Sequence, residues 1–191
     1  FRTAFYMPVV MSAVVVGMIW TNLLDSAGLV NSVLKALKII SKPIPFLTDR
    51  WGVLFSSMFV TIWLGLGYYM VIYLTALANI DESLYEAASL DGAGPVRQFI
   101  YVTMPGVRST MMLIMMLSTI AAFRVFNEIY VLTNGSAGPG GMDMTMSMLI
   151  KREGTGIQAR TGYASAISIV VLVIVGVMLI VQQILQKRGE D

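Results

Sequence analysis

The sequence has no cysteine and no histidine, and only 13% of its 191 residues are charged. Without cysteine there is no disulfide, no thiolate metal ligand and no cysteine nucleophile. Without histidine the chain lacks the commonest general base and the commonest metal ligand. A net charge of +2 is too small for a nucleic-acid-binding surface. Because soluble domains carry roughly 25% charged residues, an ordinary cytosolic enzyme is excluded too, and no nucleic acid is expected as a partner.

Long stretches without charge take the place of the missing polar residues. Residues 3–24 carry no charge over 22 positions, residues 51–80 over 30, and residues 161–186 over 26. Each exceeds the roughly 20 residues that cross about 30 Å of hydrocarbon. A fourth run, residues 109–123, covers only 15 positions, but the pattern stays apolar to residue 132. Any one run could be a buried helix of a soluble protein, but four in one short chain favour a membrane protein.

These runs predict an all-α fold. Lipid offers no hydrogen bonds to the backbone, so a spanning segment has to satisfy its own amides and carbonyls as a helix. The predicted architecture is a polytopic transmembrane helical bundle with spans at residues 3–24, 51–80, 109–132 and 161–186.

The connections between the runs differ in character. Residues 29–40 place apolar side chains at helical spacing, with two lysines off that stripe, which predicts a short helix on the membrane surface. Residues 133–160 are rich in glycine and polar residues and predict a long aqueous loop. With four spans, residues 81–108 lie on one side of the membrane with both chain ends. That side holds five lysines and arginines and the other side seven, so the positive-inside rule leans weakly towards a cytoplasmic 25–50 and 133–160.

Residues 81–108 are the most patterned connection. Ser83 and Glu86 form a possible capping box that starts a helix. Gly92 can end that helix in the left-handed conformation. Pro95 suits the first turn of a second helix, which Pro105 should limit. The pattern predicts two short helices outside the membrane, and the alanines of the first permit close approach by another protein.

A spaced motif runs through these helices. Glu-Ala-Ala at residues 86–88 is followed after three residues by Gly92 and after nine more by Val-Thr-Met-Pro at residues 102–105. This resembles the EAA loop of ABC importer permeases, which usually ends Ile-x-Leu-Pro. Residues 63–68, 130–135 and 162–166 are further matches, similar to the carbohydrate-uptake branch with its maltose-type and glycerol-3-phosphate-type permeases. The resemblance covers essentially the whole chain.

The resemblance implies a mechanism. In this family the first helix of the loop sits in a groove on a cytoplasmic ATPase subunit, and ATP-driven closure of the ATPases switches the permease between inward-open and outward-open states. It therefore implies a cytoplasmic 81–108 and an extracytoplasmic 133–160, against the charge count. The coupling residues it implies are Glu86, Ala87, Ala88, Asp91, Gly92 and Pro105.

The resemblance also implies the assembly. We expect a second permease subunit, two ABC ATPase subunits and an extracytoplasmic substrate-binding protein, in the lipid of a bacterial or archaeal inner membrane. ATP and magnesium would be used by the ATPase subunits, and this chain would carry no cofactor, no metal and no catalytic residue. About two further spans are expected before Phe1, so that the sequence would be part of a longer subunit.

Two groups of residues are candidates for the substrate path. Arg124 lies roughly 23 Å along a helix from Ser109, and Glu128 one turn further could pair with it. This pair, with Asn127, would either face a cavity or lie at the outer membrane interface, and a cavity-facing cation would favour an acidic or phosphorylated solute. By the resemblance, the other candidates are Thr61, Leu64, Gly65 and Tyr68, with Tyr68 stacking on a sugar face; alternatively, the glycines there only allow close helix packing.

Other patterns do not lead to a different function. The glycines of residues 135–141 lack the Gly-Lys-Ser/Thr of a nucleotide-binding loop, so they predict a flexible loop or a contact for the binding protein. Four methionines in residues 142–148 alternate with polar residues, and their thioethers offer an alternative interpretation as a copper site. An intramembrane enzyme is disfavoured because the spans hold no acid–base constellation. A non-ABC channel or structural membrane protein remains an alternative but leaves the spacing from Glu86 to Pro105 unexplained.

Overall fold

The computed structural model describes residues 2–188, and over these residues it contains helices and no strand, which confirms the all-α class. The predicted domain of residues 1–191 includes Phe1 and residues 189–191, which lie outside the described part. The elements in chain order are α1 Arg2–Tyr6, η1 Met7–Val10, α2 Ala13–Leu24, α3 Leu29–Ala36, α4 Arg50–Ala78, α5 Glu82–Leu90, α6 Pro95–Gln98, η2 Phe99–Thr103, α7 Met104–Gly106, α8 Arg108–Phe123, α9 Asn127–Leu132, η3 Pro139–Gly141, α10 Met146–Gly154 and α11 Thr161–Arg188.

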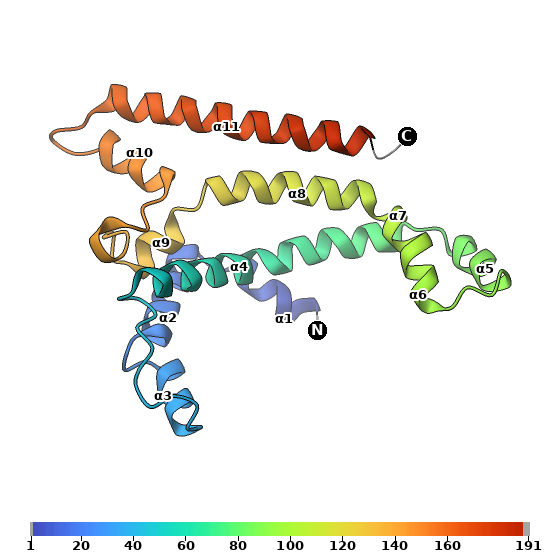
Figure 1. The fold of residues 1–191 in the computed structure, drawn as a ribbon, viewed down its shortest axis with the longest axis horizontal. Helices are drawn as coiled ribbons and strands as arrows, with labels where there is room; N and C mark the ends of the chain where they lie inside the picture. Colours follow the sequence, from blue (N-terminus) through green and yellow to red (C-terminus); the bar gives the residue numbers. More distant parts are fainter. Residues whose placement is uncertain (1, 189–191) are drawn as a thin grey trace.

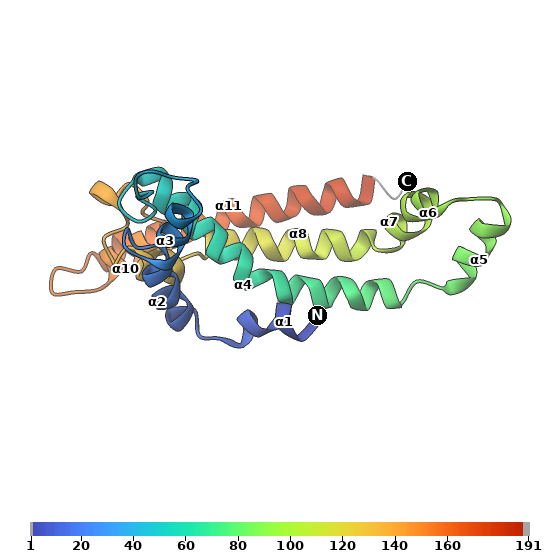
Figure 2. The ribbon, with the colours of Figure 1, turned by 90° about the horizontal axis from the view of Figure 1, so that it is seen from below.

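Three long helices, α4, α8 and α11, run side by side and give the molecule its long axis (Figure 1). The helices α5, α6 and α7 lie at one end of this layer, and α3, α9 and α10 lie at the other, in both views (Figure 2). At 1.5 Å per residue, the 29 residues of α4 and the 28 residues of α11 extend over roughly 42–44 Å. The predicted spans 51–80 and 161–186 are therefore confirmed as single helices.

Within residues 2–188, three segments are long and apolar enough to cross a membrane: Ala13–Ala36, Arg50–Ala78 and Thr161–Lys187. A fourth crossing exists if Pro95–Gly106 and Arg108–Phe123, which meet at a bend of 62°, form one span. The side chains of α11 are exposed along most of its length, as expected for a helix whose surroundings are lipid rather than protein.

The predicted continuous span at residues 3–24 is wrong. The chain forms α1, then a 3₁₀ turn containing Pro8, and then leaves the helical conformation at Met11 and Ser12 before α2 begins. Proline has no amide hydrogen and its ring disfavours a helical residue before it, which agrees with the change from α-helix to 3₁₀ turn at Pro8; the extended backbone of Met11 and Ser12 then separates this turn from α2, although every residue of the run is uncharged. Charge alone therefore overestimated the helix. The 12 residues of α2 extend over only about 18 Å and run crosswise to α4 in Figure 1.

The predicted span at residues 109–132 is also divided. Helix α8 ends at Phe123, Arg124 is its C-cap, and Phe126 has a non-helical backbone (φ −140°, ψ −59°) before α9 begins at Asn127. The second segment, α9, turns away to pack on α2, where it buries Leu132, while Ile129 is buried on another side of α9 with Ala137 and Met148. Packing of this short apolar segment, rather than its helix propensity, sets the break.

The core lies where α2, α4 and α9 meet. Val16, Val60 and Leu132, one from each helix, are almost completely buried together. The ring of Trp20 on α2 meets Phe59 and Trp63 on α4 edge to face, with ring centroids 5.1 and 5.6 Å apart. Edge-to-face pairs add about 0.5–1.5 kcal/mol to the burial of the rings themselves. This cluster anchors the crosswise α2 against the long helix α4.

A hydrogen bond between polar side chains joins α11 to α8. The Gln182 side-chain amide donates to Thr119 Oγ1 over 2.8 Å, and the Thr119 hydroxyl in turn donates to the carbonyl of Met115. Gln182 Oε1 is buried and has no partner among the described residues. The apolar surfaces of α8 and α11 could pack in several registers, and this hydrogen bond favours one of them.

Replacing Thr119 with valine is expected to lower the stability of the assembled subunit by about 0.6–1.7 kcal/mol, the range for interhelical hydrogen bonds in membranes. The valine keeps the shape but leaves the Gln182 amide without its acceptor. Thermal unfolding of the purified assembly would measure the effect. Thr75→Val is the matched control, because Thr75 donates only to Val71 within its own helix; equal losses from both variants would contradict a role for the interhelical bond.

Candidate functional site

The first helix of the patterned connection, α5, is capped at its start by a side chain and at its end by backbone hydrogen bonds. It begins at Glu82, and Asp81 is its N-cap, with the Asp81 carboxylate accepting from the Ser83 amide over 2.9 Å. The predicted capping box from Ser83 is therefore wrong by two residues, because the carboxylate of Asp81 accepts from the Ser83 amide that Glu86 was expected to cap, and it also suits the positive helix N-terminus. The hydrogen bond from the Ser83 backbone lowers the pKa of Asp81 below its usual 3.8.

The end of α5 agrees with the prediction. Gly92 has φ +73°, and its amide donates to Ser89 O over 3.0 Å, while Ala93 N donates to Ala88 O over 2.9 Å. These two bonds are the Schellman motif, which needs a residue in the left-handed region at this position. Pro95 then occupies the first turn of α6, as the sequence predicted.

Side-chain hydrogen bonds fix α5 against the second helical segment. The Tyr85 hydroxyl lies 2.8 Å from Thr103 Oγ1, and Gln98 Nε2 donates to Ser89 Oγ over 2.8 Å and to Ala93 O over 3.2 Å. These contacts hold the two short helices at a fixed angle at one end of the long-helix layer (Figure 1). A helix of nine residues would be marginal in isolation, so these contacts stabilise α5 in the folded chain.

One face of α5 points away from the rest of the chain. Ser83, Glu86, Ala87 and Leu90, at helical spacing i, i+3, i+4 and i+7, are all exposed. We call these four residues the outer face of α5. Ala88, which the sequence placed in the same contact surface as Ala87, is half-buried on the inner side, and Asp91 and Gly92 follow as exposed residues at the helix end.

Sequence reasoning missed the largest apolar side chain on this face. Leu90 is 90% exposed although it belongs to a packed helix. The signal was available in the sequence, because Leu90 lies seven residues from Ser83 and three from Ala87 on the same helical face.

The second helical segment does not stop at Pro105 as predicted. The chain passes through a π-helical turn, η2, in which the Met104 amide bonds to Phe99 O, and α7 continues through Pro105 to Gly106. The wider turn accommodates the proline, which has no amide hydrogen of its own to donate. The helix is interrupted only at Val107, whose side chain is buried next to the start of α8.

A groove lies between α4 and α8, and two of the four predicted path residues on α4 line it. Its wider part encloses about 610 Å³ and its narrower part about 280 Å³, with Thr61, Ile62 and Ala122 lining both parts. We call the two parts together the α4–α8 groove. Thr61 and Gly65 line it; the polar lining residues that sequence reasoning missed are Tyr69, Tyr73, Ser118, Ser57 and Thr145.

The missed tyrosines follow a simple rule of helical spacing. Thr61, Gly65, Tyr69 and Tyr73 are four residues apart and therefore share one face of α4. Tyr68, the tyrosine predicted instead, is 45% exposed and lines neither part of the groove, although its ring meets that of Tyr69 with centroids 5.4 Å apart.

Leu64 lies elsewhere. It is half-buried and packs against the core cluster of Val16, Val60 and Leu132.

Arg124, Asn127 and Glu128 lie at the break between α8 and α9 and line neither part of the α4–α8 groove, although Val125 between them lines its narrower part. Arg124 and Asn127 are exposed and Glu128 is half-buried. No Arg124–Glu128 ion pair is present in the part of the chain that the structure describes. The i, i+4 argument required one continuous helix, and the break at Phe126 removes that geometry.

The glycine-rich segment of the connection 133–160 is folded rather than loose. Ala137 is fully buried with Ile129 and Met148, although its backbone has φ +57°. The Lys151 ammonium on α10 lies 4.7 and 4.3 Å from the ring centroids of Phe126 and Tyr130. A satellite core and cation–π contacts therefore order a segment for which composition predicted flexibility.

Asp143 is the one acid in this folded segment whose pKa is raised. Its side chain is 8% exposed, and Oδ2 has no partner among the described residues. Desolvation raises the pKa of Asp143 above 3.8; Arg50 opposes this shift and Asp49 adds to it. The folded protein therefore binds this proton more tightly than the unfolded chain does, so stability should fall as pH rises from about 3.8 through the raised pKa.

Replacing Asp143 with asparagine is expected to abolish this pH-dependent loss while keeping the shape of the side chain. Unfolding temperatures of the purified assembly between about pH 4 and pH 7 would measure it. The exposed Asp91→Asn is the control, and an unchanged pH profile of Asp143→Asn would contradict the assignment.

The four methionines of residues 142–148 lie in different environments. Met148 is buried in the satellite core and Met144 packs against it, whereas Met142 and Met146 are 64% and 51% exposed. Across residues 2–188, no group of three or more histidine, cysteine, aspartate or glutamate side chains is placed to hold a metal ion.

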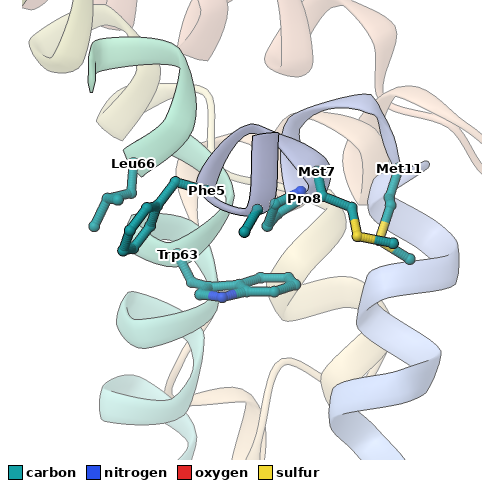
Figure 3. A pocket seen from close by; sticks show the side chains of 7 residues that line it. Phe5, Met7, Pro8, Met11, Trp63 and Leu66 are labelled. Carbon is teal, nitrogen blue, oxygen red and sulfur yellow. The ribbon is translucent and has the colours of Figure 1, made fainter. Parts of the chain in front are cut away.

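A separate cavity of about 410 Å³ lies between the N-terminal segment and α4 (Figure 3). Trp63 and Leu66 of α4 face Phe5, Pro8 and the two methionines of the kinked segment there. The lining is apolar apart from the indole nitrogen of Trp63, so the cavity offers at most one hydrogen-bond donor to a polar solute. We assign it to packing.

The chain matches the family described as "Binding-protein-dependent transport system inner membrane component" over residues 1–190. It is 34% identical to the probable ABC transporter permease protein YurN of Bacillus subtilis, covering 100% of this chain and 65% of that protein. It is 33% identical to the lactose transport system permease protein LacF of Rhizobium radiobacter, covering 95% of this chain and 61% of that protein. It is 30% identical to the arabinooligosaccharides transport system permease protein AraP of Halalkalibacterium halodurans, covering 100% of this chain and 61% of that protein. The chain therefore spans less than two thirds of the length of these relatives.

Two solved structures share the fold. One is a crystal structure of a bacterial ABC transporter involved in the import of the acidic polysaccharide alginate, and the other is a bacterial alginate ABC transporter in complex with an alginate pentasaccharide-bound periplasmic protein. Their TM-scores are 0.77 and 0.78 at 23% identity, covering 98% of this chain and 64% of the solved chains. Given the match over nearly all its residues, the chain belongs to the family of binding-protein-dependent transport system inner membrane components.

Proposed function

We propose that the chain is part of the permease subunit of an ATP-driven ABC importer and forms part of the path for a sugar or sugar-like solute. The observation that carries the proposal is the outer face of α5, a rigid, exposed helical surface at one end of the long-helix layer. The relatives LacF and AraP, named as permeases for lactose and arabinooligosaccharides, support a sugar as the solute.

In this proposal α5 docks on an ABC ATPase subunit in the cytoplasm, and residues 133–160 face a substrate-binding protein outside. The assembly contains a second permease subunit and two ATPase subunits, and ATP and magnesium are used by the ATPases rather than by this chain. The subunit crosses a bacterial or archaeal inner membrane several times. A non-ABC channel or structural protein would have no use for the preorganised α5.

The α4–α8 groove fits a sugar chemically. Tyr69 and Tyr73 offer aromatic faces for the apolar side of a pyranose. Thr61 and Ser118 donate their hydroxyl hydrogens to backbone carbonyls of Ser57 and Met115, at 2.8 and 3.0 Å. Each hydroxyl oxygen therefore keeps lone pairs that can accept from sugar hydroxyls.

A cross-link tests the docking surface. Because these 191 residues contain no cysteine, Ala87→Cys in a full-length subunit with any remaining cysteines replaced by serine provides a single thiol on the outer face of α5 for a photo-cross-linker. In inside-out membrane vesicles we expect an ABC ATPase subunit as the main adduct, identified by mass spectrometry. Gln158→Cys, exposed in the connection before α11, is the control that should give no ATPase adduct. An ATPase adduct at Gln158, or a thiol at residue 87 that reacts from outside intact cells, would refute the proposal.

Replacing Arg124 with glutamine tests whether its exposed guanidinium, one residue from the groove-lining Val125, selects the solute. If Arg124 contacts an anionic group, uptake of an acidic solute should fall about tenfold or more, as for loss of a charge-assisted hydrogen bond. Uptake of a neutral sugar should change little. Measuring transport of matched neutral and acidic oligosaccharides separates the cases, and unchanged preference would leave Arg124 as an interfacial residue.

A further inference from the structure

The chain between α2 and α4 forms a compact hairpin at the end of the molecule that is opposite α5 (Figure 1). It consists of α3 and an irregular segment that runs back towards α4. We call residues 26–48 together the basic hairpin. Its closure depends on Asn31, which is only 1% exposed. Asn31 Nδ2 donates to Asp25 O and Ile44 O, each over 3.1 Å, and Ile44 N donates to Asn31 Oδ1 over 2.8 Å.

The basic hairpin carries charge of one sign only. Between Asp25 and Asp49 it contains Lys35, Lys38 and Lys42 and no acidic residue. All three lysines are exposed, and none of them forms an ion pair in the described part of the chain. Lys38 has φ +56°, where the backbone turns from α3 into the return segment. The turn brings three ammonium groups onto one small, fixed element.

Large apolar side chains are exposed on the same element. Leu29, Val33, Leu37 and Ile39 are 63%, 46%, 64% and 65% exposed, respectively. Sequence spacing predicted one stripe including Val30 and Leu34, but these two are half-buried, so the exposed side is rotated towards Leu29 and Val33. Apolar side chains that enter the acyl boundary, together with lysines that reach headgroups, are the mark of an interfacial anchor.

We propose that the basic hairpin binds anionic phospholipid headgroups on the membrane face opposite the α5 end. Lysines near an anionic surface are attracted to its lipids. Burial of the exposed leucine, valine and isoleucine side chains at the acyl boundary adds to the free energy of membrane binding. The inference goes beyond the proposed transport function, because it needs only the membrane location of the family. It also accounts for the unfavourable charge count: three of the seven basic residues assigned to that face belong to this hairpin.

The test uses the full-length subunit in its assembled complex, with Ala36→Cys carrying an environment-sensitive fluorophore on the hairpin. The complex is placed in nanodiscs of phosphatidylcholine alone or of phosphatidylcholine mixed with phosphatidylglycerol. We expect phosphatidylglycerol to shift the fluorophore towards an apolar environment, and salt to reverse the shift. The same fluorophore at Gln158→Cys, at the other exposed connection of this end, should not respond.

Two triple variants identify the lysines as the cause. Each lysine should change the ratio of bound to free hairpin about fivefold, so Lys35→Gln, Lys38→Gln and Lys42→Gln together should reduce it about a hundredfold. The corresponding triple arginine variant keeps the charge and should keep the response.

Three results would overturn the proposal: a signal independent of phosphatidylglycerol and salt in the wild-type hairpin, a lipid response retained by the glutamine variant, or a response that appears only when an acidic protein partner is added. The first needs no substitution of a lysine, so a folding defect in the variants leaves the proposal testable. Failure of ATPase cross-linking at residue 87 would affect the transport proposal and not this one.

Discussion

Replacing Gly67 with alanine is expected to destabilise the packing of the N-terminal segment on α4 by about 1–3 kcal/mol, the usual range for overpacking. A Cβ at this position would collide with the backbone oxygen of Phe5 and lie 2.8 Å from Tyr6 Cα. Backbone atoms cannot rotate away as the end of a side chain can, so α1 would have to move off α4. Thermal unfolding of the purified full-length assembly measures the loss.

Gly176 provides the matched control for this substitution. It lies within α11, and a Cβ there meets nothing within 4 Å. Gly176→Ala should therefore leave stability unchanged or raise it slightly, because alanine is the better helix former. If both alanine variants unfold at the wild-type temperature, the close approach of α1 to α4 is not part of the folded subunit. If both are destabilised equally, the contact with Phe5 is not the cause.

Replacing Leu90 with aspartate is expected to give the largest functional loss. If the outer face of α5 docks on an ATPase, Leu90 loses its exposure in the complex, and burying such a side chain contributes about 1.5–3 kcal/mol. An aspartate there would also have to be desolvated without a partner. ATP-coupled uptake should fall at least about tenfold, with normal levels of the subunit in the membrane. Uptake and ATPase stimulation in reconstituted vesicles are the measurements.

Ile157→Asp is the control for introducing the same charge. Ile157 is also fully exposed, at 106%, but lies in the connection before α11, at the end of the layer opposite α5. Ile157→Asp should leave ATPase stimulation unchanged. Leu90→Met keeps an apolar side chain and should therefore retain most of the wild-type uptake that Leu90→Asp loses. Normal coupling in Leu90→Asp would show that α5 does not dock through this face, whatever the fate of the cross-link from residue 87.

Local signals in the sequence account for much of the agreement between the predicted elements and the observed fold. Charge-free runs predicted α4 and α11 because length and composition are properties of each segment by itself. Gly92 and Pro95 were correctly placed at the end of α5 and the start of α6 because each is selected by a single backbone conformation. The start of α5 was missed because Asp81 and Ser83 are both acceptable caps, and only the folded backbone chooses between them.

The candidate site shows the same division. Thr61 and Gly65 line the α4–α8 groove, but so do Tyr69 and Tyr73, which the sequence did not single out, because the choice among neighbouring tyrosines depends on which face of α4 meets α8. The Arg124–Glu128 pair was expected from spacing on one helix, whereas the packing of α9 on α2 bends the chain at Phe126. Helical spacing places Leu90 on one face with Ser83 and Ala87, but only the contact of α5 with η2 through Tyr85 and Thr103 decides that this face is the exposed one.

The sequence by itself determined that the chain is helical, membrane-embedded and free of cysteine and histidine chemistry, and it located the two short helices of residues 81–108. These properties depend on composition, on the length of apolar runs and on residues a few positions apart, which act before any tertiary contact forms. Only the tertiary structure decided where the apolar runs break, which tyrosines face the groove and that the glycine-rich segment packs around Ala137. These depend on contacts between segments far apart in the chain, whose packing energy outweighs local propensity.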